Sequence, residues 1–226
     1  MIGTIVNFFA VIAGSAIGLI VHSKLPERYI KIVFQGIGLF TLLIGIQMGL
    51  KTQNLLIMVF SIILGSITGE FFNIETNTNK LAEILKKKVK SKNDKFTEGL
   101  ITSFLLFCMG SMSVLGCIQE GLGGSPDLLF AKSALDGFSS IALASSMGIG
   151  VMFSAIPLLI YQGGLTLFAS FLQHILTAQV VNELTAVGGL LLLGLGINLL
   201  EIKKIKVLNM LPALLCAAIL AYFFIK

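Results

Sequence analysis

The feature that most constrains this chain is a series of apolar runs of about 20 residues, each long enough to cross the roughly 30 Å hydrocarbon core of a membrane as a helix. Inside a bilayer only helices and closed barrels satisfy all of their backbone polar groups. The chain is also 56% hydrophobic and only 12% charged. A soluble domain is about one quarter charged. These features predict an all-α transmembrane bundle that forms a single domain over residues 1–226.

We expect eight spans, at about residues 2–21, 32–50, 55–72, 99–118, 128–146, 148–172, 184–200 and 207–225. The first run lacks a charged segment before it, so we interpret it as a retained span rather than a signal peptide. Within the sixth span we expect a break near Pro157 or near Gly163 and Gly164. Seven spans, with the fifth and sixth merged, are the alternative.

The basic residues predict which side of the membrane each loop occupies. Several lysines or arginines lie in the first, third and seventh loops, at 22–31, 73–98 and 201–206. One or none lies in the second, fourth and sixth loops, at 51–54, 120–127 and 173–183. With eight spans every strongly basic loop falls on one side, which is the cytoplasm by the positive-inside rule. Both termini then lie outside.

The segment 74–97 carries seven lysines, namely Lys80, Lys86, Lys87, Lys88, Lys90, Lys92 and Lys95. Between them Leu81, Ile84, Leu85 and Val89 recur at helical spacing, which predicts a basic amphipathic helix capped by Thr78 or Asn79. One interpretation is that its charge only sets the topology. The other is that the helix contacts anionic lipid headgroups.

Two segments of the chain resemble each other. Residues 38–47 align without a gap to residues 189–198, and this alignment pairs Gly38 with Gly189, Gly45 with Gly196 and Gln47 with Asn198. Spans one to three and six to eight therefore look like two copies that enter the membrane from opposite sides. Such an inverted repeat is common in secondary transporters. The predicted subdivision is 1–73 for the first repeat, 74–97 for the basic loop, 98–147 for the central spans and 148–226 for the second repeat.

The fifth span carries a cation and an anion. Lys132 and Asp136 are four residues apart and share a helical face. An ionisable residue inside a membrane segment marks a site or a pathway by default. The predicted path for an ion or a polar solute is lined by Asp136, Lys132, Ser139, Ser140, Gln162, Asn198 and Gln47. The competing interpretation is an internal salt bridge, with Lys132 reaching toward the interface and the amides joining helices.

Glycines spaced four residues apart predict close helix packing, because small residues let two backbones approach in lipid. The three pairs are Gly14 and Gly18, Gly45 and Gly49, and Gly65 and Gly69. Two acidic residues near span ends, Glu70 and Glu120, are expected at the membrane interface.

Catalytic chemistry finds little support in the sequence. Asp136-Gly137 has no second aspartate in a matching motif, and Ser111 and Ser113 have no base nearby. His22 and His174 each stand alone at a span end, which argues against a metal site. We predict no catalytic residue, no metal site, no cofactor and no nucleic-acid partner. The expected partner is the lipid bilayer, and a homo-oligomer stays open.

Several segments resemble one family of bacterial membrane proteins. They are LFCMGSMSVLGCIQEG at 106–121, KSALDGF at 132–138, YQGG at 161–164, LPER at 25–28 and QGIG at 35–38. Together they resemble the family catalogued as domain of unknown function 554, over nearly the whole chain. The resemblance implies a bacterial inner-membrane protein of seven or eight spans, and it carries over no functional residues.

The polar fifth span and the repeat favour a small secondary transporter or channel for an ion or a small polar solute. The alternative is a non-transporting membrane scaffold or sensor that acts through the basic loop 74–97. A transporter requires the polar side chains to converge on one site, whereas a scaffold would leave them paired in helix contacts.

Overall fold

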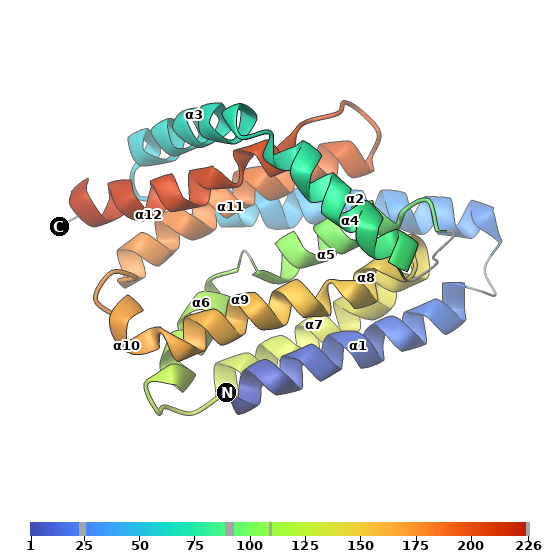
Figure 1. The fold of residues 1–226 in the computed structure, drawn as a ribbon, viewed down its shortest axis with the longest axis horizontal. Coiled ribbons are helices and arrows are strands. Elements are labelled where there is room, and N and C mark those ends of the chain that lie inside the picture. The colour runs from blue at the N-terminus through green and yellow to red at the C-terminus, as the bar shows by residue number, and fades with distance from the viewer. Residues whose placement is uncertain (23–25, 89–92, 109, 225–226) are drawn as a thin grey trace. The chain divides into compact units, whose positions relative to one another are not determined.

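The structure is a computed structural model that describes residues 1–22, 26–88, 93–108 and 110–224 (Figure 1). Within these residues it is entirely helical, with no strand. The helices form two compact units, of which the first comprises residues 1–37, 82–108 and 112–172. The second comprises residues 38–81 and 173 onward, with a short piece at Gly110 and Ser111. Each predicted repeat contributes helices to both units.

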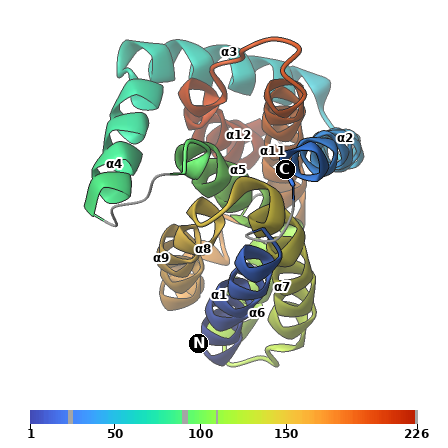
Figure 2. The same ribbon diagram turned by 90° about the vertical axis from the view of Figure 1, so that its right-hand side faces the viewer.

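The described residues of the first unit form nine helices in whole or in part. They are α1 (Ile2–His22), the start of α2 (Glu27–Gly49), the end of α4 (Ile74–Lys88), α5 (Phe96–Cys108), α6 (Ser111–Gly121), α7 (Asp127–Met147), α8 (Gly150–Phe153), α9 (Ala155–Leu167) and α10 (Ala169–Leu172). Helices α1 and α7 lie side by side over most of their length in Figures 1 and 2.

Glycines set the close approach of α1 to α7. A Cβ at Gly14 would collide with the carbonyl oxygen of Gly137, and one at Gly18 would collide with that of Ile141. Because Gly3 packs on Leu129, sequence numbers rise together along both helices, and α1 and α7 run parallel. Small residues at this spacing bring two backbones together in lipid.

The chain reverses direction after α7. Helix α7 ends at Gly148, whose φ of 77° lies in the left-handed region that glycine tolerates. On the return, the helix is interrupted at Ser154 and then runs through Gly163 and Gly164 without a break. Of the two positions predicted for a break, the one near Pro157 fits this interruption and the one at Gly163 and Gly164 does not. Pro157 lies three residues past the interruption and supplies no N–H to the carbonyl of Phe153.

The expected fourth span is two helices rather than one. Helices α5 and α6 lie at an angle of 62° to each other, and Met109 between them lies outside the described residues. Ser113 Oγ donates a hydrogen bond to the Phe107 carbonyl oxygen at 2.7 Å across this bend. The hydroxyl thereby satisfies a carbonyl that the helix end leaves without an intrahelical partner.

The second unit contains the remainder of α2, α3 (Leu55–Phe71), the start of α4, α11 (Ala178–Leu199), the 3₁₀ turn η1 (Val207–Met210) and α12 (Pro212–Phe224). Helices α3 and α12 are antiparallel, because Gly65 packs on Ala213 while Gly69 packs on Asn209. Helices α2 and α11 are also antiparallel: Gly45 approaches Gly189, and Gly196 approaches Gly38.

Helix α3 shows how the apolar residues are distributed. Its buried face is a row of small and medium side chains at every fourth position, Ile57, Ser61, Gly65 and Gly69. Its outward face carries the exposed side chains Leu55, Leu56, Val59, Phe60, Ile63, Leu64 and Ile67. A soluble helix places its large apolar residues inside. Small residues inside and large apolar residues outside are what a lipid environment favours.

The basic amphipathic segment begins earlier than expected. Helix α4 starts at Ile74, so Thr78 and Asn79 lie inside the helix and do not cap it. It leaves α3 at an angle of 60°, and Asn73 at the bend has a left-handed φ of 50°. Figure 2 shows α4 turning away from the end of α3. Val89, Lys90 and Lys92 of the predicted segment lie outside the described residues.

Four described stretches are long and apolar enough to cross a membrane: Ile2–Val21, Gly150–Leu167, Ala178–Leu199 and Val207–Phe224. The number rises to 6 if the bent pairs α3 with α4 and α5 with α6 each count as one span. Helix α7 has 21 residues, a comparable length, but it includes Asp127, Lys132 and Asp136. The chain is therefore a polytopic helical protein with four to six such candidate spans.

Candidate functional site

The centre of the candidate site is an ion pair on α7. Lys132 Nζ lies 2.8 Å from Asp136 Oδ1 and 2.6 Å from Asp136 Oδ2, so the ammonium contacts both carboxylate oxygens. The spacing of four residues on a helix places these side chains next to each other. Both are buried, with side-chain exposures of 7% and 8%. Burial removes the water that would otherwise solvate the two charges, which makes each dependent on the other.

A side chain from α1 completes the carboxylate's partners. Asn7 Nδ2 donates to Asp136 Oδ2 at 3.0 Å and to Gln162 Oε1 of α9 at 3.2 Å. The close packing of α1 on α7 described above brings Asn7 within reach. One charged pair and two amides from three helices therefore meet inside the first unit.

A pair of hydroxyls extends this cluster along α1. Thr4 Oγ1 and Thr166 Oγ1 of α9 are 3.3 Å apart, and both threonines are buried. Thr4 contacts Thr166, and Asn7 contacts Gln162, so residue numbers increase along α1 while they decrease along α9. Helices α1 and α9 are therefore antiparallel where they meet.

Two atoms in the cluster have unused hydrogen-bonding capacity. Asn7 Oδ1 and Gln162 Nε2 are buried, and neither has a hydrogen-bond partner. Leaving a buried polar atom unpaired costs about 1–3 kcal/mol. One is an acceptor and the other is a donor, so water or a polar ligand could pair with both. The charged pair carries no net charge, and a binding partner would therefore compete for Lys132 or Asp136 individually.

The predicted serines play different parts. Ser140 Oγ donates to the Asp136 backbone carbonyl, one helical turn back, so its hydroxyl is used within α7. Ser133 does the same to Leu129. Serines commonly bond back to the preceding turn of a helix in this way. Ser139 is half-buried.

The two remaining predicted residues belong to the second unit. Asn198 both donates to the Ile205 carbonyl and accepts from the Ile205 N–H, at 2.8 and 2.6 Å. Its amide thus closes the turn that follows α11. Gln47 is exposed on α2. Asn7 joins Gln162 to Asp136, which is paired with Lys132.

The second unit has a buried carboxylate of its own. Glu183 in α11 is fully buried and accepts hydrogen bonds from Thr52 Oγ1 at 2.7 Å, Gln53 N at 2.6 Å and Asn54 N at 3.1 Å. These donors lie in the turn that precedes α3, so Glu183 anchors this turn to α11. Glu183 is not among the predicted site residues, although an acid in the first turns of an apolar helix was a usable signal.

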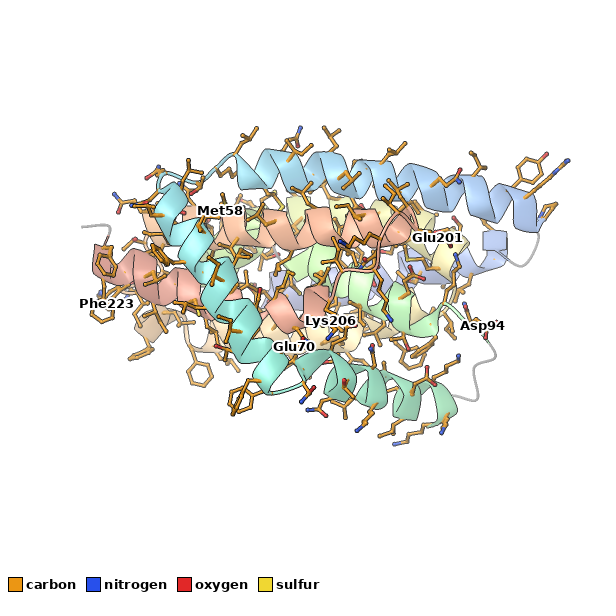
Figure 3. All side chains as sticks on the ribbon, turned by 90° about the horizontal axis from the view of Figure 1, so that it is seen from above. Met58, Glu70, Asp94, Glu201, Lys206 and Phe223 are labelled. Carbon is orange, nitrogen blue, oxygen red and sulfur yellow. The ribbon has the colours of Figure 1, made fainter. Side chains whose placement is uncertain are left out.

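An exposed network fixes the bend between α3 and α4. Lys206 Nζ donates to Glu70 Oε1 at 2.6 Å, and Asn209 Nδ2 donates to Glu70 Oε2 at 2.6 Å. Asn209 Oδ1 accepts from the Glu75 N–H at 2.6 Å. Figure 3 shows Glu70 and Lys206 next to each other at this bend. The hydrogen bond with Glu70 raises the pKa of Lys206 above its ordinary value.

The structure describes no group of three His, Cys, Asp or Glu side chains, among residues 1–22, 26–88, 93–108 and 110–224, that could hold a metal ion. The residue that sequence reasoning missed at the candidate site is Asn7. Thr4 and Asn7 are three residues apart on α1 and both fully buried. This spacing on one helical face was the available signal.

Comparisons with known proteins agree with the motif resemblance. Residues 2–222 match the family described as Protein of unknown function (DUF554). The chain is 36% identical over 228 residues to the "Uncharacterized membrane protein YdfK" of Bacillus subtilis (strain 168), covering 98% of this chain and 96% of that protein. It is 36% identical over 222 residues to the "Uncharacterized protein YqgA" of Escherichia coli (strain K12), covering 96% and 94%.

No solved structure matches the chain. The family match spans nearly the whole sequence, and both relatives align over almost their full lengths. Apolar helices long enough to cross a bilayer agree with the membrane protein named among the relatives. The chain therefore belongs to the DUF554 family, as its motifs predicted, and it is a multi-pass membrane protein.

Proposed function

We propose that the protein is a small secondary transporter or channel that binds an ion or a small polar solute at Lys132, Asp136, Asn7 and Gln162. The observation that carries this proposal is the buried ion pair surrounded by amides with unused hydrogen-bonding atoms. A charged pair that served only to join helices would gain from having every neighbouring polar atom satisfied.

The chemistry of the cluster suits an exchange of partners. Lys132 and Asp136 come from the same helix, so their pairing holds no two helices together. A cation that binds Asp136 would release Lys132, and a polar solute would pair with Asn7 Oδ1 and Gln162 Nε2. Intramembrane charges generally mark ion or substrate pathways because their burial is costly.

Contacts at the helix ends support eight spans. In the second unit Glu183 ties the end of the sixth loop to the second loop, and Lys206 ties the seventh loop to the end of α3. In the first unit the Gly3 N–H bonds Glu120 near the fourth loop, and Asn93 bonds the Met147 carbonyl at the turn after α7. Every one of these contacts joins segments that the eight-span arrangement places on the same side.

Antiparallel pairing supports the inverted repeat. Each helix of the first predicted copy contacts its counterpart in the second copy, α1 with α9, α2 with α11 and α3 with α12. Each pair is antiparallel. Between α2 and α11 the contacts are also reciprocal, since Gly38 meets the counterpart of Gly45 and Gly45 meets the counterpart of Gly38. A two-fold relation between copies produces this pattern.

The basic residues orient the arrangement. Lys203, Lys204 and Lys206 and the lysines of α4 are on the side that faces the cytoplasm by the positive-inside rule. Both termini then face outside, in the inner membrane of a bacterium. Cysteines placed at the exposed positions Ser125 and Ala178 should react with a membrane-impermeant thiol reagent added to intact cells, and one at Lys204 should not. Shielding of Ala178 would contradict eight spans.

A thermal-shift screen of the purified protein tests the function. Cations, a series of pH values and small polar metabolites are added separately to the wild type, to Asp136→Asn and to Asp127→Asn. A ligand at 100 times its dissociation constant stabilises the folded state by about 2.7 kcal/mol. We expect a stabilising ligand for the wild type and for the exposed control Asp127→Asn, and none for Asp136→Asn.

A screen in which no ligand stabilises the wild type, or in which Asp136→Asn responds like the wild type, would contradict the proposal. The cluster would then be a structural element, and a scaffold or sensor acting through the basic helix α4 would become the better interpretation.

A further inference from the structure

A second buried carboxylate lies in the same unit as Asp136. Glu120 is in the last turn of α6, and its side chain is only 5% exposed. Its Oε1 accepts the Gly3 N–H at 2.7 Å and lies 3.1 Å from the Met1 amino nitrogen. Its Oε2 is buried and has no hydrogen-bond partner. The sequence had suggested an interfacial position for Glu120, so its burial is a finding of the structure.

Polar groups connect Glu120 to Asp136 along α1. From Gly3, which bonds Glu120, to Asn7, which bonds Asp136, the helix rises about 6 Å. Between these two points lies the hydroxyl pair of Thr4 and Thr166. The Cys117 thiol, one turn before Glu120 on α6, interacts with both hydroxyls. Polar contacts to α1 thus occur at Gly3, Thr4 and Asn7, between the two carboxylates.

This series of polar groups is confined to the buried side of α1. Thr4, Asn7 and Ser15 are fully buried, whereas Ile2, Ile5, Val6, Phe9 and Ile17 are exposed. Ser15 Oγ, two turns beyond Asn7, is also without a partner. In a bilayer an unpaired polar group is costly, and apolar side chains would pack there without that cost. A series of buried groups with unused acceptors therefore favours a path over a packing role.

We propose that Glu120 is a second binding station for a small monovalent cation, either a proton or an alkali ion, on the path to Asp136. The unused atoms at Glu120 and Asn7 are oxygens, which bind protons and hard cations. Each carboxylate already has one cationic partner, so a divalent ion would meet little net negative charge. Glu120 stands nearer the end of the unit where α1 begins, and the role depends on the function proposed above.

Flux into proteoliposomes tests the station. The wild type, Glu120→Gln, Asp136→Asn and Asp127→Asn are reconstituted and given, in separate arms, a proton gradient with an impermeant buffer cation and a sodium or potassium gradient at constant pH. We expect both Glu120→Gln and Asp136→Asn to lose most of the initial rate in the same arm. The exposed control Asp127→Asn should keep the wild-type rate.

The two proposals fail in different ways. Flux that persists in Glu120→Gln but is lost in Asp136→Asn would overturn the station and leave the transport site. An absence of wild-type flux in every arm would overturn both. Glu120→Gln could disturb the start of α1, so Glu120→Asp, which keeps the charge, serves as a control. We expect Glu120→Asp to recover part of the rate. A purely structural anchor would show equal losses in both variants.

A chemical readout needs no transport. Dicyclohexylcarbodiimide modifies buried carboxyl groups in their protonated form, and mass spectrometry of the peptide that contains Glu120 measures the adduct. We expect modification of Glu120 that falls as the permeant cation is added. Modification that is absent, or insensitive to that cation, would overturn the station.

Discussion

The described residues include two lysine–carboxylate pairs that have the same closest N–O distance in opposite surroundings. Lys132 and Asp136 in the first unit, and Lys206 and Glu70 in the second unit, each approach to 2.6 Å. The first pair has side-chain exposures of 7% and 8%, and the second has 59% and 55%. Distance alone would rank the two pairs as equal, so the surroundings decide what each pair does.

The exposed pair keeps much of its contact with the surrounding solvent or headgroups, so removing one partner leaves a charge that can be solvated again. The buried pair lacks that alternative. Its carboxylate and its ammonium depend on each other and on Asn7. We infer that the exposed pair positions the bend between α3 and α4, while the buried pair can respond to whatever competes for its charges.

Glu183 provides an intermediate case. It is fully buried like Asp136, but three donors from one turn satisfy its oxygens, and no cation is among them. The Asp136 cluster instead includes buried atoms without partners. A carboxylate whose partners are complete fixes a turn, whereas one beside unused donors and acceptors can accept a ligand.

The largest effect is expected from Lys132→Met. It leaves the Asp136 carboxylate buried without its cation, and breaking a buried pair in this way costs about 3–5 kcal/mol. We expect a loss of that size in the unfolding free energy, measured by denaturant titration in mixed micelles. The double variant Lys132→Met with Asp136→Asn should recover much of the loss, because no unpaired charge remains. Equal destabilisation of the single and double variants would show that burial is not what makes the Lys132–Asp136 pair differ from the exposed pair Lys206–Glu70.

Glu183→Ala should have the next largest effect. It leaves the Thr52 hydroxyl and two backbone N–H groups without an acceptor in a partly buried turn. We expect a loss of about 2 kcal/mol of unfolding free energy, within the usual range for unsatisfied buried groups. Any ligand that stabilises the wild type in the thermal-shift screen should stabilise Glu183→Ala by the same amount. A lost ligand response would place Glu183 among the binding residues.

The sequence made the ion pair predictable but not its neighbours. Spacing on a single helix places Lys132 beside Asp136, and this needs no knowledge of tertiary structure. Asn7 of α1 reaches the pair, and Gln162 of α9 reaches Asn7, from helices that are far away in sequence, so only helix packing decides these contacts. Asn198 shows the limit of prediction from sequence, because its amide forms hydrogen bonds with Ile205 in the turn after α11.

The fold was predictable to a similar depth. Apolar length predicted the helices, and the basic loops predicted a turn between the fifth and sixth spans, where the chain reverses after α7. The bend between α5 and α6 was not predicted, although the stretch from Phe107 to Ser113 contains Gly110 and Ser111, a pair at which helices commonly kink. Burial of Glu120 depends on the start of α1 packing beside α6, which is again a tertiary effect.

A smaller effect is expected where glycine controls helix approach in the second unit. A Cβ at Gly45 would lie 2.8 Å from the Gly189 carbonyl oxygen, whereas a Cβ at Gly49, one turn away, would meet nothing within 4 Å. We expect Gly45→Ala to cost about 1–2 kcal/mol through overpacking. Gly49→Ala should leave the unfolding free energy unchanged within error. If both variants behaved alike, α2 and α11 would not pack through these residues.

The smallest effect is expected from Lys206→Ala, the exposed counterpart of Lys132→Met. At neutral pH its melting temperature should differ little from that of the wild type, because both partners are more than half exposed.

The hydrogen bond with Glu70 raises the pKa of Lys206 above 10.5, so the folded state holds this proton more tightly than the unfolded state. The stability that the pair contributes is then fully present below the unfolded pKa and is lost as the pH rises through the folded pKa. The small difference in melting temperature between the wild type and Lys206→Ala should therefore disappear in strongly alkaline buffer. High salt at neutral pH screens the pair and should remove the difference as well. A large difference at neutral pH that persisted in high salt would mean that the Glu70 network carries stability comparable to the buried pair, and that exposure is not what distinguishes them.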